Sequence, residues 1–150
     1  KYLCWVAPDT GEILSRRKSP RSGRPTDILP EIYRLPAVQQ HPHLRFCIAL
    51  LDAEEYRLMD GWDSSGKRGS HRLERSPLGL AELVYLQTAA DYQAILPPLP
   101  DRFTRAEAAK ALRLSPQKTG YAVTALERSG AIERDGTAGR AFCYRKSNLA

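Results

Sequence analysis

Basic side chains gathered in three stretches of the sequence are the residues whose type and spacing could do chemistry. Residues 1–24 have a net charge of +4, residues 66–76 of +3 and residues 101–150 of +5, in a chain of 150 residues with a net charge of +6. The stretches between them are acidic, with net charges of −4 over residues 25–65 and −2 over residues 77–100. Clustered cations favour a polyanion as partner, because each phosphate that they neutralise releases counterions. The acidic stretches argue against uniform coating of a nucleic acid.

Two basic stretches, at residues 15–24 and 66–76, have the composition of surface loops. Small residues, glycine and proline separate their cations, as is typical of turns and mobile loops. Loops of this kind can contact phosphates of a nucleic-acid backbone, which position a protein without reading sequence. The cations that we expect to make such contacts are Arg16, Arg17, Lys18, Lys67, Arg68 and Arg72.

The second of these loops contains the beginning of a nucleotide-binding motif. Gly61, Gly66 and Lys67 match the first part of the phosphate-binding pattern G-x-x-x-x-G-K-[ST]. Arg68 stands where that pattern needs Ser or Thr for a magnesium ion, and Gly69 opposes the helix that must follow. The sequence therefore argues against nucleotide hydrolysis.

The histidines and cysteines do not have the spacing of a metal site. His41 and His43 are two residues apart across a proline with no cysteine nearby, whereas a structural zinc site needs four ligands at close spacings. Cys4, Cys47 and Cys143 lie far apart in apolar runs, which is typical of buried free thiols in a reducing cytoplasm. We therefore expect no metal, no cofactor and no disulfide, and a cytoplasmic location.

The elements that would position these residues begin with an α/β arrangement in the first half. Tyr2–Ala7 and Glu12–Lys18 are strand-like runs joined by an Asp-Thr-Gly turn signal. Residues 26–35 indicate a helix with Pro30 in its first turn, and Leu44–Leu51 indicates a strand buried on both faces. The order strand, strand, helix, strand predicts one crossover connection. The acidic residues around and after the last strand, which we interpret as solvated charges, are Asp52, Glu54, Glu55 and Asp60.

This order of elements resembles the PD-(D/E)xK nuclease-like fold, in which a strand hairpin precedes a helix and a further strand. Pro8-Asp9 followed by Glu12 matches the acidic part of its motif, so the resemblance makes Asp9 and Glu12 the two candidates for catalytic acids. Leu14 stands where the motif has the lysine that a metal-dependent nuclease needs near the attacked phosphate. We therefore expect no catalysis from this pair. Lys1 in first position indicates a fragment of a longer protein, which leaves the C-terminal part of a nuclease or another DNA-processing enzyme as an alternative.

The last third of the sequence contains two capped helices followed by a hairpin. A T-x-x-E capping box begins at Thr104, and Ser115 before Pro116 begins a second helix that Gly130 ends. Two short strands then flank residues 136–139. This order is similar to that of the winged-helix family of DNA-binding domains, over roughly a third of the chain.

The resemblance implies that the second helix enters the major groove and that the hairpin contacts the DNA backbone. It places on the exposed helix face Gln117, Lys118, Tyr121 and Thr124, and on the hairpin Arg134, Arg140 and Arg145. A Gln side chain can bind adenine through two hydrogen bonds, and Lys and Arg reach guanine or phosphate. Gly120 lies within this helix, where glycine costs about 1 kcal/mol relative to alanine. It either allows close approach to a phosphate or only weakens the helix.

Leucines from Leu78 to Leu96 predict a long amphipathic helix before this region, with an apolar face that could serve the core or a homodimer. We therefore expect an α+β or α/β protein with two domains, a platform over residues 1–76 and a winged helix-turn-helix over residues 77–150. No apolar run approaches the roughly 20 residues that span a bilayer, so we expect a soluble protein without membrane contact. The predicted function is binding of double-stranded DNA, in transcription regulation or another DNA-associated role. A protein-interaction module is the remaining alternative.

Overall fold

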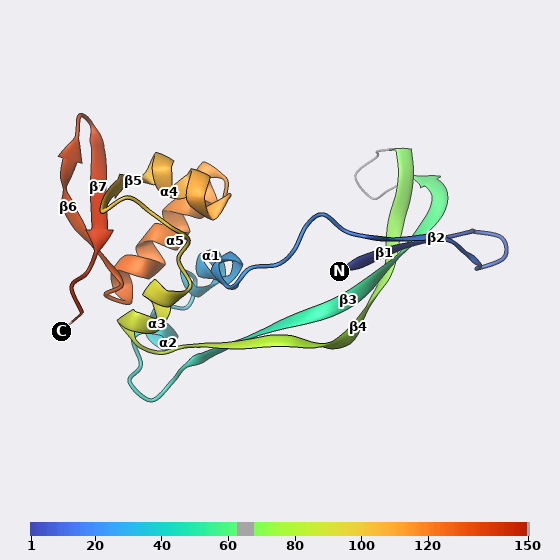
Figure 1. Ribbon diagram of the computed structural model, residues 1–150, viewed down its shortest axis with the longest axis horizontal. Helices are drawn as coiled ribbons and strands as arrows, with labels where there is room; N and C mark the ends of the chain where they lie inside the picture. The colour runs from blue at the N-terminus through green and yellow to red at the C-terminus, as the bar shows by residue number, and fades with distance from the viewer. Residues whose placement is uncertain (63–67, 150) are drawn as a thin grey trace. The chain divides into compact units, whose positions relative to one another are not determined.

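The computed structural model describes residues 1–62 and 68–149 as a mixed α+β protein with two β-sheets and a few helices (Figure 1). The first sheet consists, in spatial order, of β2 (Ile13–Lys18), β1 (Tyr2–Val6), β3 (Phe46–Trp62) and β4 (Arg68–Leu86). The second consists of β5 (Arg102–Thr104), β7 (Ala141–Lys146) and β6 (Ile132–Ala138). The predicted α+β class is confirmed at this level.

The chain divides into two compact units that are interleaved along the sequence. Unit 1 comprises residues 1–24 and 49–83, and unit 2 comprises residues 25–48 and 84–150. This division differs from the expected boundary at residue 76. The reason is that residues 25–48, which the sequence suggests as part of the platform, contribute Leu29 and Ile32 to the hydrophobic core of unit 2.

Unit 1 is built on β1, which pairs antiparallel with β2 and parallel with residues 54–58 of β3. The predicted order of strand, strand, helix and strand is present along the sequence, but its helical segment, residues 25–48, belongs to unit 2 and not to the platform. The strand expected at Leu44–Leu51 is different, because β3 extends to Trp62 and Leu51 is 53% exposed rather than buried. Leu51 lies outside the part of β3 that pairs with β1. The buried apolar residues of unit 1 are Cys4, Val6, Ala7 and Ala53.

The long helix expected from Leu78 to Leu96 is wrong in its first half. Residues 78–86 belong to strand β4, and only a short helix, α3 (Ala89–Ala94), follows. Leu78, Leu80, Val84 and Leu86 are spaced by even numbers of residues, as in a strand, whereas Leu80, Leu83 and Val84 have helical spacing. Pairing with β3 decides for the strand. Likewise, the basic loop expected up to Arg75 is mostly strand, since β4 begins at Arg68.

The helices of unit 2 are short in the first segment and longer in the second. They are the 3-10 helix η1 (Pro25–Ile28), α1 (Leu29–Ile32), α2 (Pro36–Gln39), α3, α4 (Arg105–Leu112) and α5 (Pro116–Arg128). The helix predicted over residues 26–35 is thus interrupted. Leu35 has φ −121° and ψ 54°, outside the helical region, because a residue before proline is disfavoured there.

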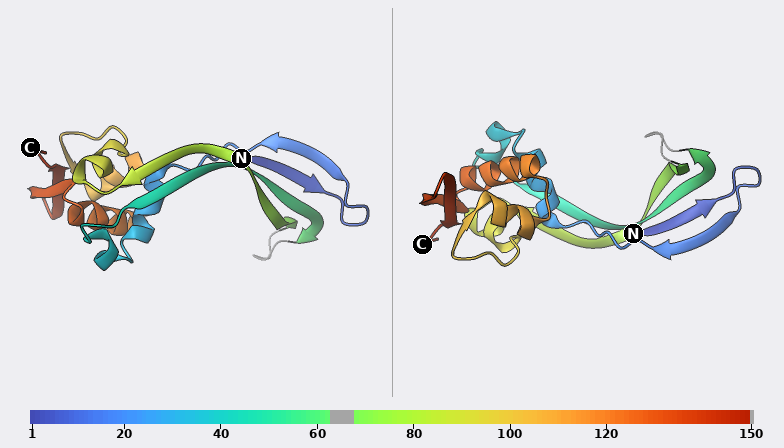
Figure 2. Two further views of the ribbon diagram at one scale, coloured as in Figure 1. Left: turned by 90° about the horizontal axis from the view of Figure 1, so that it is seen from below. Right: turned by 90° about the horizontal axis from the view of Figure 1, so that it is seen from above.

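The core of unit 2 lies between α1, α5 and the second sheet. Leu29 and Ile32 of α1 pack in one cluster with Val123 and Leu126 of α5, and α1 and α5 are neighbours in all three views (Figures 1 and 2). Tyr144 of β7 is fully buried in the same cluster. In the described parts of the chain, no helix has the length and apolar character needed to cross a membrane.

Candidate nucleic-acid interface

The beginning of α5 is positioned by its cap and by the turn that precedes it. The Ser115 hydroxyl accepts a hydrogen bond from the Lys118 backbone N–H at 3.4 Å, and Pro116 occupies the first turn of the helix. Arg113 ends α4 in the left-handed conformation, with φ 52° and ψ 43°. Gln117, Lys118 and Arg113 are all exposed. In the described chain, neither Arg113 nor Lys118 takes part in an ion pair with a carboxylate.

Tyr121, one turn further along α5, is covered by Tyr33, the residue that follows α1. The Tyr121 ring stacks on the Tyr33 ring with centroids 4.5 Å apart and planes inclined by 16°. Gln117 Nε2 donates to the Tyr121 hydroxyl at 3.1 Å, and Arg128 Nη1 donates to the Tyr33 carbonyl at 2.9 Å. The Tyr121 ring and hydroxyl are therefore already engaged within unit 2, and Tyr121 is half-buried.

Thr124, which the resemblance also places on the exposed helix face, is half-buried and bonded within the helix. Its hydroxyl donates to the Gly120 carbonyl at 3.0 Å. Of the four residues expected on this face, the structure leaves Gln117 and Lys118 exposed and turns Tyr121 and Thr124 partly inward. For Tyr121 the sequence pattern of α5 could not show this, because the covering residue, Tyr33, lies far away in the chain.

The three arginines of the β6–β7 hairpin differ in whether a carboxylate pairs with them. Arg134 pairs with Glu127 at 2.9 Å and its guanidinium lies 4.7 Å from the Phe142 ring centroid. Arg145 pairs with Glu133 at 2.8 Å. Arg140, in the turn between the strands, is exposed and belongs to no ion pair within the described residues. Of these three arginines, Arg140 is the one whose guanidinium is not engaged by a carboxylate in the described chain.

The hairpin is also held by Arg102, which the sequence analysis missed. Arg102 of β5 donates from Nε to the Asp135 carbonyl at 3.0 Å and from Nη2 to the Thr137 carbonyl at 3.2 Å. Its Nε lies 3.5 Å from the Asp135 carboxylate. These bonds bind β6 to β5, although β7 lies between them in the sheet. No local pattern around Arg102 indicates such a role.

In unit 1, the described basic residues that we expect to contact a nucleic-acid backbone lie on strands instead of loops. Arg16 pairs with Glu54 at 2.7 Å and lies over the Tyr2 ring, and Arg17 lies over the Trp5 ring, with centroid distances of 3.9 and 4.7 Å. Of the other residues expected to contact phosphates, the structure describes two. Lys18 is exposed on β2 and Arg72 on β4, whereas Lys67 and the side chain of Arg68 lie outside the described residues.

Asp9 and Glu12 lie in the turn that joins β1 to β2. Asp9 Oδ1 accepts from the Thr10 backbone N–H at 3.0 Å, and the Glu12 carbonyl accepts from the Ala7 N–H at 2.9 Å. Both side chains are exposed. Residues 1–62 and 68–149 contain no group of three or more His, Cys, Asp or Glu side chains arranged to hold a metal ion.

The acidic residues that the sequence suggests as solvated include one that is buried. Glu55 is 3% exposed and accepts hydrogen bonds from Lys1 at 3.0 Å, Arg57 at 3.0 Å and Arg75 at 2.7 Å. Burial alone would raise the pKa of Glu55, but hydrogen bonds from Arg75 and Lys1 outweigh it and lower the pKa from 4.5 to about 2. The interpretation of Glu55 as a solvated charge was wrong, because its partners are distant in sequence.

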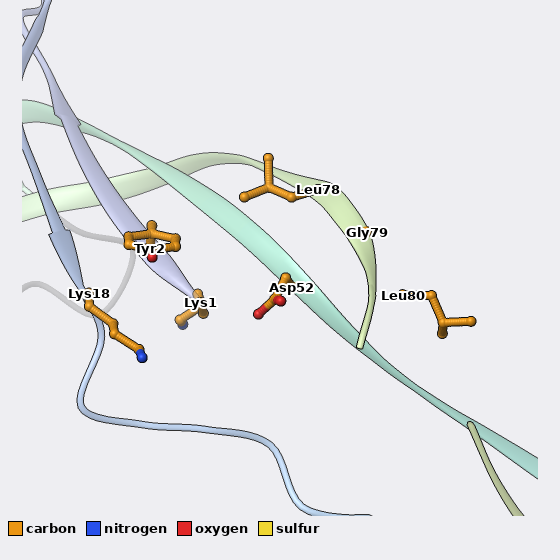
Figure 3. A pocket seen from close by; sticks show the side chains of 7 residues that line it. All are labelled: Lys1, Tyr2, Lys18, Asp52, Leu78, Gly79 and Leu80. Atoms are coloured by element: carbon orange, nitrogen blue, oxygen red, sulfur yellow. The ribbon is translucent and has the colours of Figure 1, made fainter. Parts of the chain in front are cut away.

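A shallow cavity of about 320 Å³ opens beside this network in unit 1. Lys1, Lys18 and Asp52 lie along one part of its wall, and Leu78 and Leu80 of β4 along another (Figure 3). Lys1 therefore contributes both to the cavity wall and to the pairing of Glu55.

Comparison with known proteins places the first part of the chain in a family. The model described as "Domain of unknown function (DUF8091)" matches residues 1–87, which include all of unit 1 and end just after β4. No curated protein and no solved structure matches the chain.

Proposed function

This chain belongs to the DUF8091 family, and we propose that it binds double-stranded DNA through unit 2. In this proposal α4 and α5 form a helix-turn-helix, and the β6–β7 hairpin is its wing. A regulator or another DNA-associated protein, acting in the cytoplasm, would use such a unit.

The observation that supports the proposal is the position of the unpaired cations. Arg113 and Lys118 lie at the turn between α4 and α5, and Arg140 lies at the turn between β6 and β7. Neighbouring arginines of the same region, Arg134 and Arg145, are neutralised by glutamates. Free cations are thus found at the two places where a winged helix would meet a duplex.

The charge of unit 2 agrees with a polyanionic partner. Its two segments contain 12 Lys and Arg against 8 Asp and Glu, a net charge of +4. Such an excess raises the association rate with DNA and makes the affinity depend on salt. Because Tyr121 and Thr124 are turned partly inward, we assign groove contact to Gln117 and Lys118. We assign backbone contact to Arg113 and Arg140, with weaker contributions from Arg134 and Arg145.

Unit 1 would add backbone contacts through Arg17, Lys18 and Arg72, whose side chains make no ion pair in the described chain. Arg16 is less available, since Glu54 already neutralises it. The stoichiometry of the complex would show whether one copy or a homodimer occupies the duplex.

Fluorescence anisotropy with a labelled duplex, repeated from low to high salt, tests the proposal. Each phosphate contact contributes about 0.9 to the slope of log affinity against log salt, so Arg113→Ala and Arg140→Ala should each reduce the slope by about that amount. Lys110→Ala, which removes an exposed lysine from α4, is the matched control and should leave the slope unchanged. Binding that is absent, or insensitive to salt, would refute the proposal and favour a protein partner.

A further inference from the structure

The network around Glu55 in unit 1 contains more positive charge than its structural role requires. Lys1 Nζ and Arg75 Nη2 both contact Glu55 Oε2, at 3.0 and 2.7 Å, while Arg57 Nη1 contacts Oε1 at 3.0 Å. Three cations therefore surround one carboxylate, whose side chain is 4% exposed. The network has a net charge of +2.

The hydrogen-bond donors of the three cations are used to different extents. Arg57 uses all three of its nitrogens, since Nη1 donates to Glu55 and Nε and Nη2 donate to the Ser70 hydroxyl and carbonyl at 3.0 Å each. Arg75 donates only from Nη2 to Glu55 among its described contacts, although a guanidinium carries five N–H donors. Lys1 likewise uses one of the three donors of its ammonium group. Arg75 and Lys1 are therefore the members with donors to spare.

The spare donors lie close together and reach solvent. Because Lys1 Nζ and Arg75 Nη2 contact the same oxygen, the two nitrogens are no more than about 6 Å apart. The side chain of Arg75 is 49% exposed and that of Lys1 is 28% exposed, whereas Glu55 between them is almost fully covered. Two cations this close together are within the span of one tetrahedral anion.

We propose that Arg75 and Lys1 form a binding site for a phosphate monoester, with Glu55 as the positioning residue. A guanidinium binds phosphate through two parallel hydrogen bonds, and an ammonium group adds a point charge. A phosphate monoester carries about −1.5 to −2 charges at pH 7, which matches the net charge of the network, whereas a phosphodiester carries about one. The ionised state of Glu55 supports the arrangement, since its pKa is lowered to about 2.

The ligand could be a free phosphorylated small molecule or the terminal phosphate of a nucleic acid. Both present the same group to Arg75, and neither requires that unit 2 bind duplex DNA. Isothermal titration of the full chain with inorganic phosphate and with a mononucleotide 5′-monophosphate tests the first source. A single-stranded oligonucleotide with a 5′-phosphate, compared with the same oligonucleotide ending in a 5′-hydroxyl, tests the second.

The variants separate a built site from simple charge attraction. Arg75→Gln should weaken binding of each phosphate probe by at least about tenfold, and Arg75→Lys should retain part of the affinity. Arg34→Gln, which removes an exposed arginine that pairs with Glu31 and makes no bond to Glu55, should change it less than about twofold. All titrations are compared at one ionic strength.

Glu55→Gln provides the sharpest discrimination. This change makes the network more positive, so charge attraction alone would tighten phosphate binding, whereas loss of positioning weakens it. We expect weaker binding, together with a shift of the Arg75 Nε resonance in the free protein. Tighter binding by Glu55→Gln, or unchanged binding by Arg75→Gln, would overturn the proposal. If Glu55→Gln does not fold, the comparison of Arg75→Gln with Arg75→Lys decides, because equal affinities of these two variants would also overturn it.

Discussion

Replacing Gly120 by alanine should stabilise the protein. Gly120 lies in the interior of α5, and a Cβ atom built on it would meet no atom within 4 Å. Its backbone has no positive φ that would require glycine. The helix therefore bears the conformational cost of glycine without a packing gain, so Gly120→Ala should raise the free energy of unfolding by about 0.5–1 kcal/mol.

The bond from the Thr124 hydroxyl to the Gly120 carbonyl should survive the substitution, because it uses only the backbone of residue 120. For a chain of this size the gain corresponds to a rise in Tm of about 1–4 °C. Urea unfolding followed by far-ultraviolet circular dichroism measures it. Gly130→Ala is the matched control, since Gly130 has φ +73° and its added Cβ would meet nothing closer than Ala89 Cβ at 3.8 Å. That variant should lose about 1–2 kcal/mol through backbone strain alone.

A Gly120→Ala protein that is less stable than the parent would refute the reasoning, because some contact of the glycine would then have been overlooked. The same variant also tests why a glycine is present. If the α5 backbone approaches a DNA phosphate at this point, Gly120→Ala should bind duplex more weakly while being more stable. Unchanged affinity would mean that the glycine does not serve close approach.

Two further predictions concern stability. The pKa of Glu55 is lowered from 4.5 to about 2, so its ionised form stabilises the fold above about pH 4.5, and this contribution is lost as the pH falls towards 2. The shift corresponds to at most about 3 kcal/mol, and solvent screening at the half-exposed Arg75 reduces it. The free energy of unfolding in urea should therefore fall by about 1 kcal/mol more between pH 7 and pH 3 in the parent than in Glu55→Gln. Equal losses in the two proteins would contradict this pairing. Thr104→Ala should lower the unfolding free energy by about 1 kcal/mol, because Thr104 and Glu107 cap α4 reciprocally, with bonds of 2.7 and 3.4 Å. A loss no larger than that of Thr137→Ala, on the exposed hairpin, would show that the cap is not needed.

The features that sequence predicts well here are those set by near neighbours in the chain. The capping box at Thr104, the cap at Ser115 and the left-handed Gly130 are all confirmed, since each depends on residues within a few positions. The apolar pattern from Leu78 to Leu86 is ambiguous, because one subset of its residues has the strand period and another has helical spacing. Only the neighbouring strand β3 removes the ambiguity.

The candidate sites show the same limit. Gln117 and Lys118 are exposed as expected, but Tyr121 is stacked on Tyr33, a residue that no pattern around α5 could reveal. In the sequence Glu55 cannot be told apart from the acidic residues around it. Its burial depends on Lys1 and Arg75, which are 54 and 20 residues away. Side-chain chemistry in this protein is therefore decided mainly by contacts between distant segments.

The interleaving of the two units has a consequence for the order in which the chain can fold during synthesis. Leu29 and Ile32 are made before the second half of unit 1, whereas the α5 residues that cover them are made after it. Until then these apolar side chains stay accessible to solvent and to other chains. Closing such a long loop is slow, and transiently exposed apolar surface favours aggregation. Folding of unit 2 should therefore finish only after α5 and the β6–β7 hairpin have emerged from the ribosome, whereas unit 1 can form as soon as β4 has emerged.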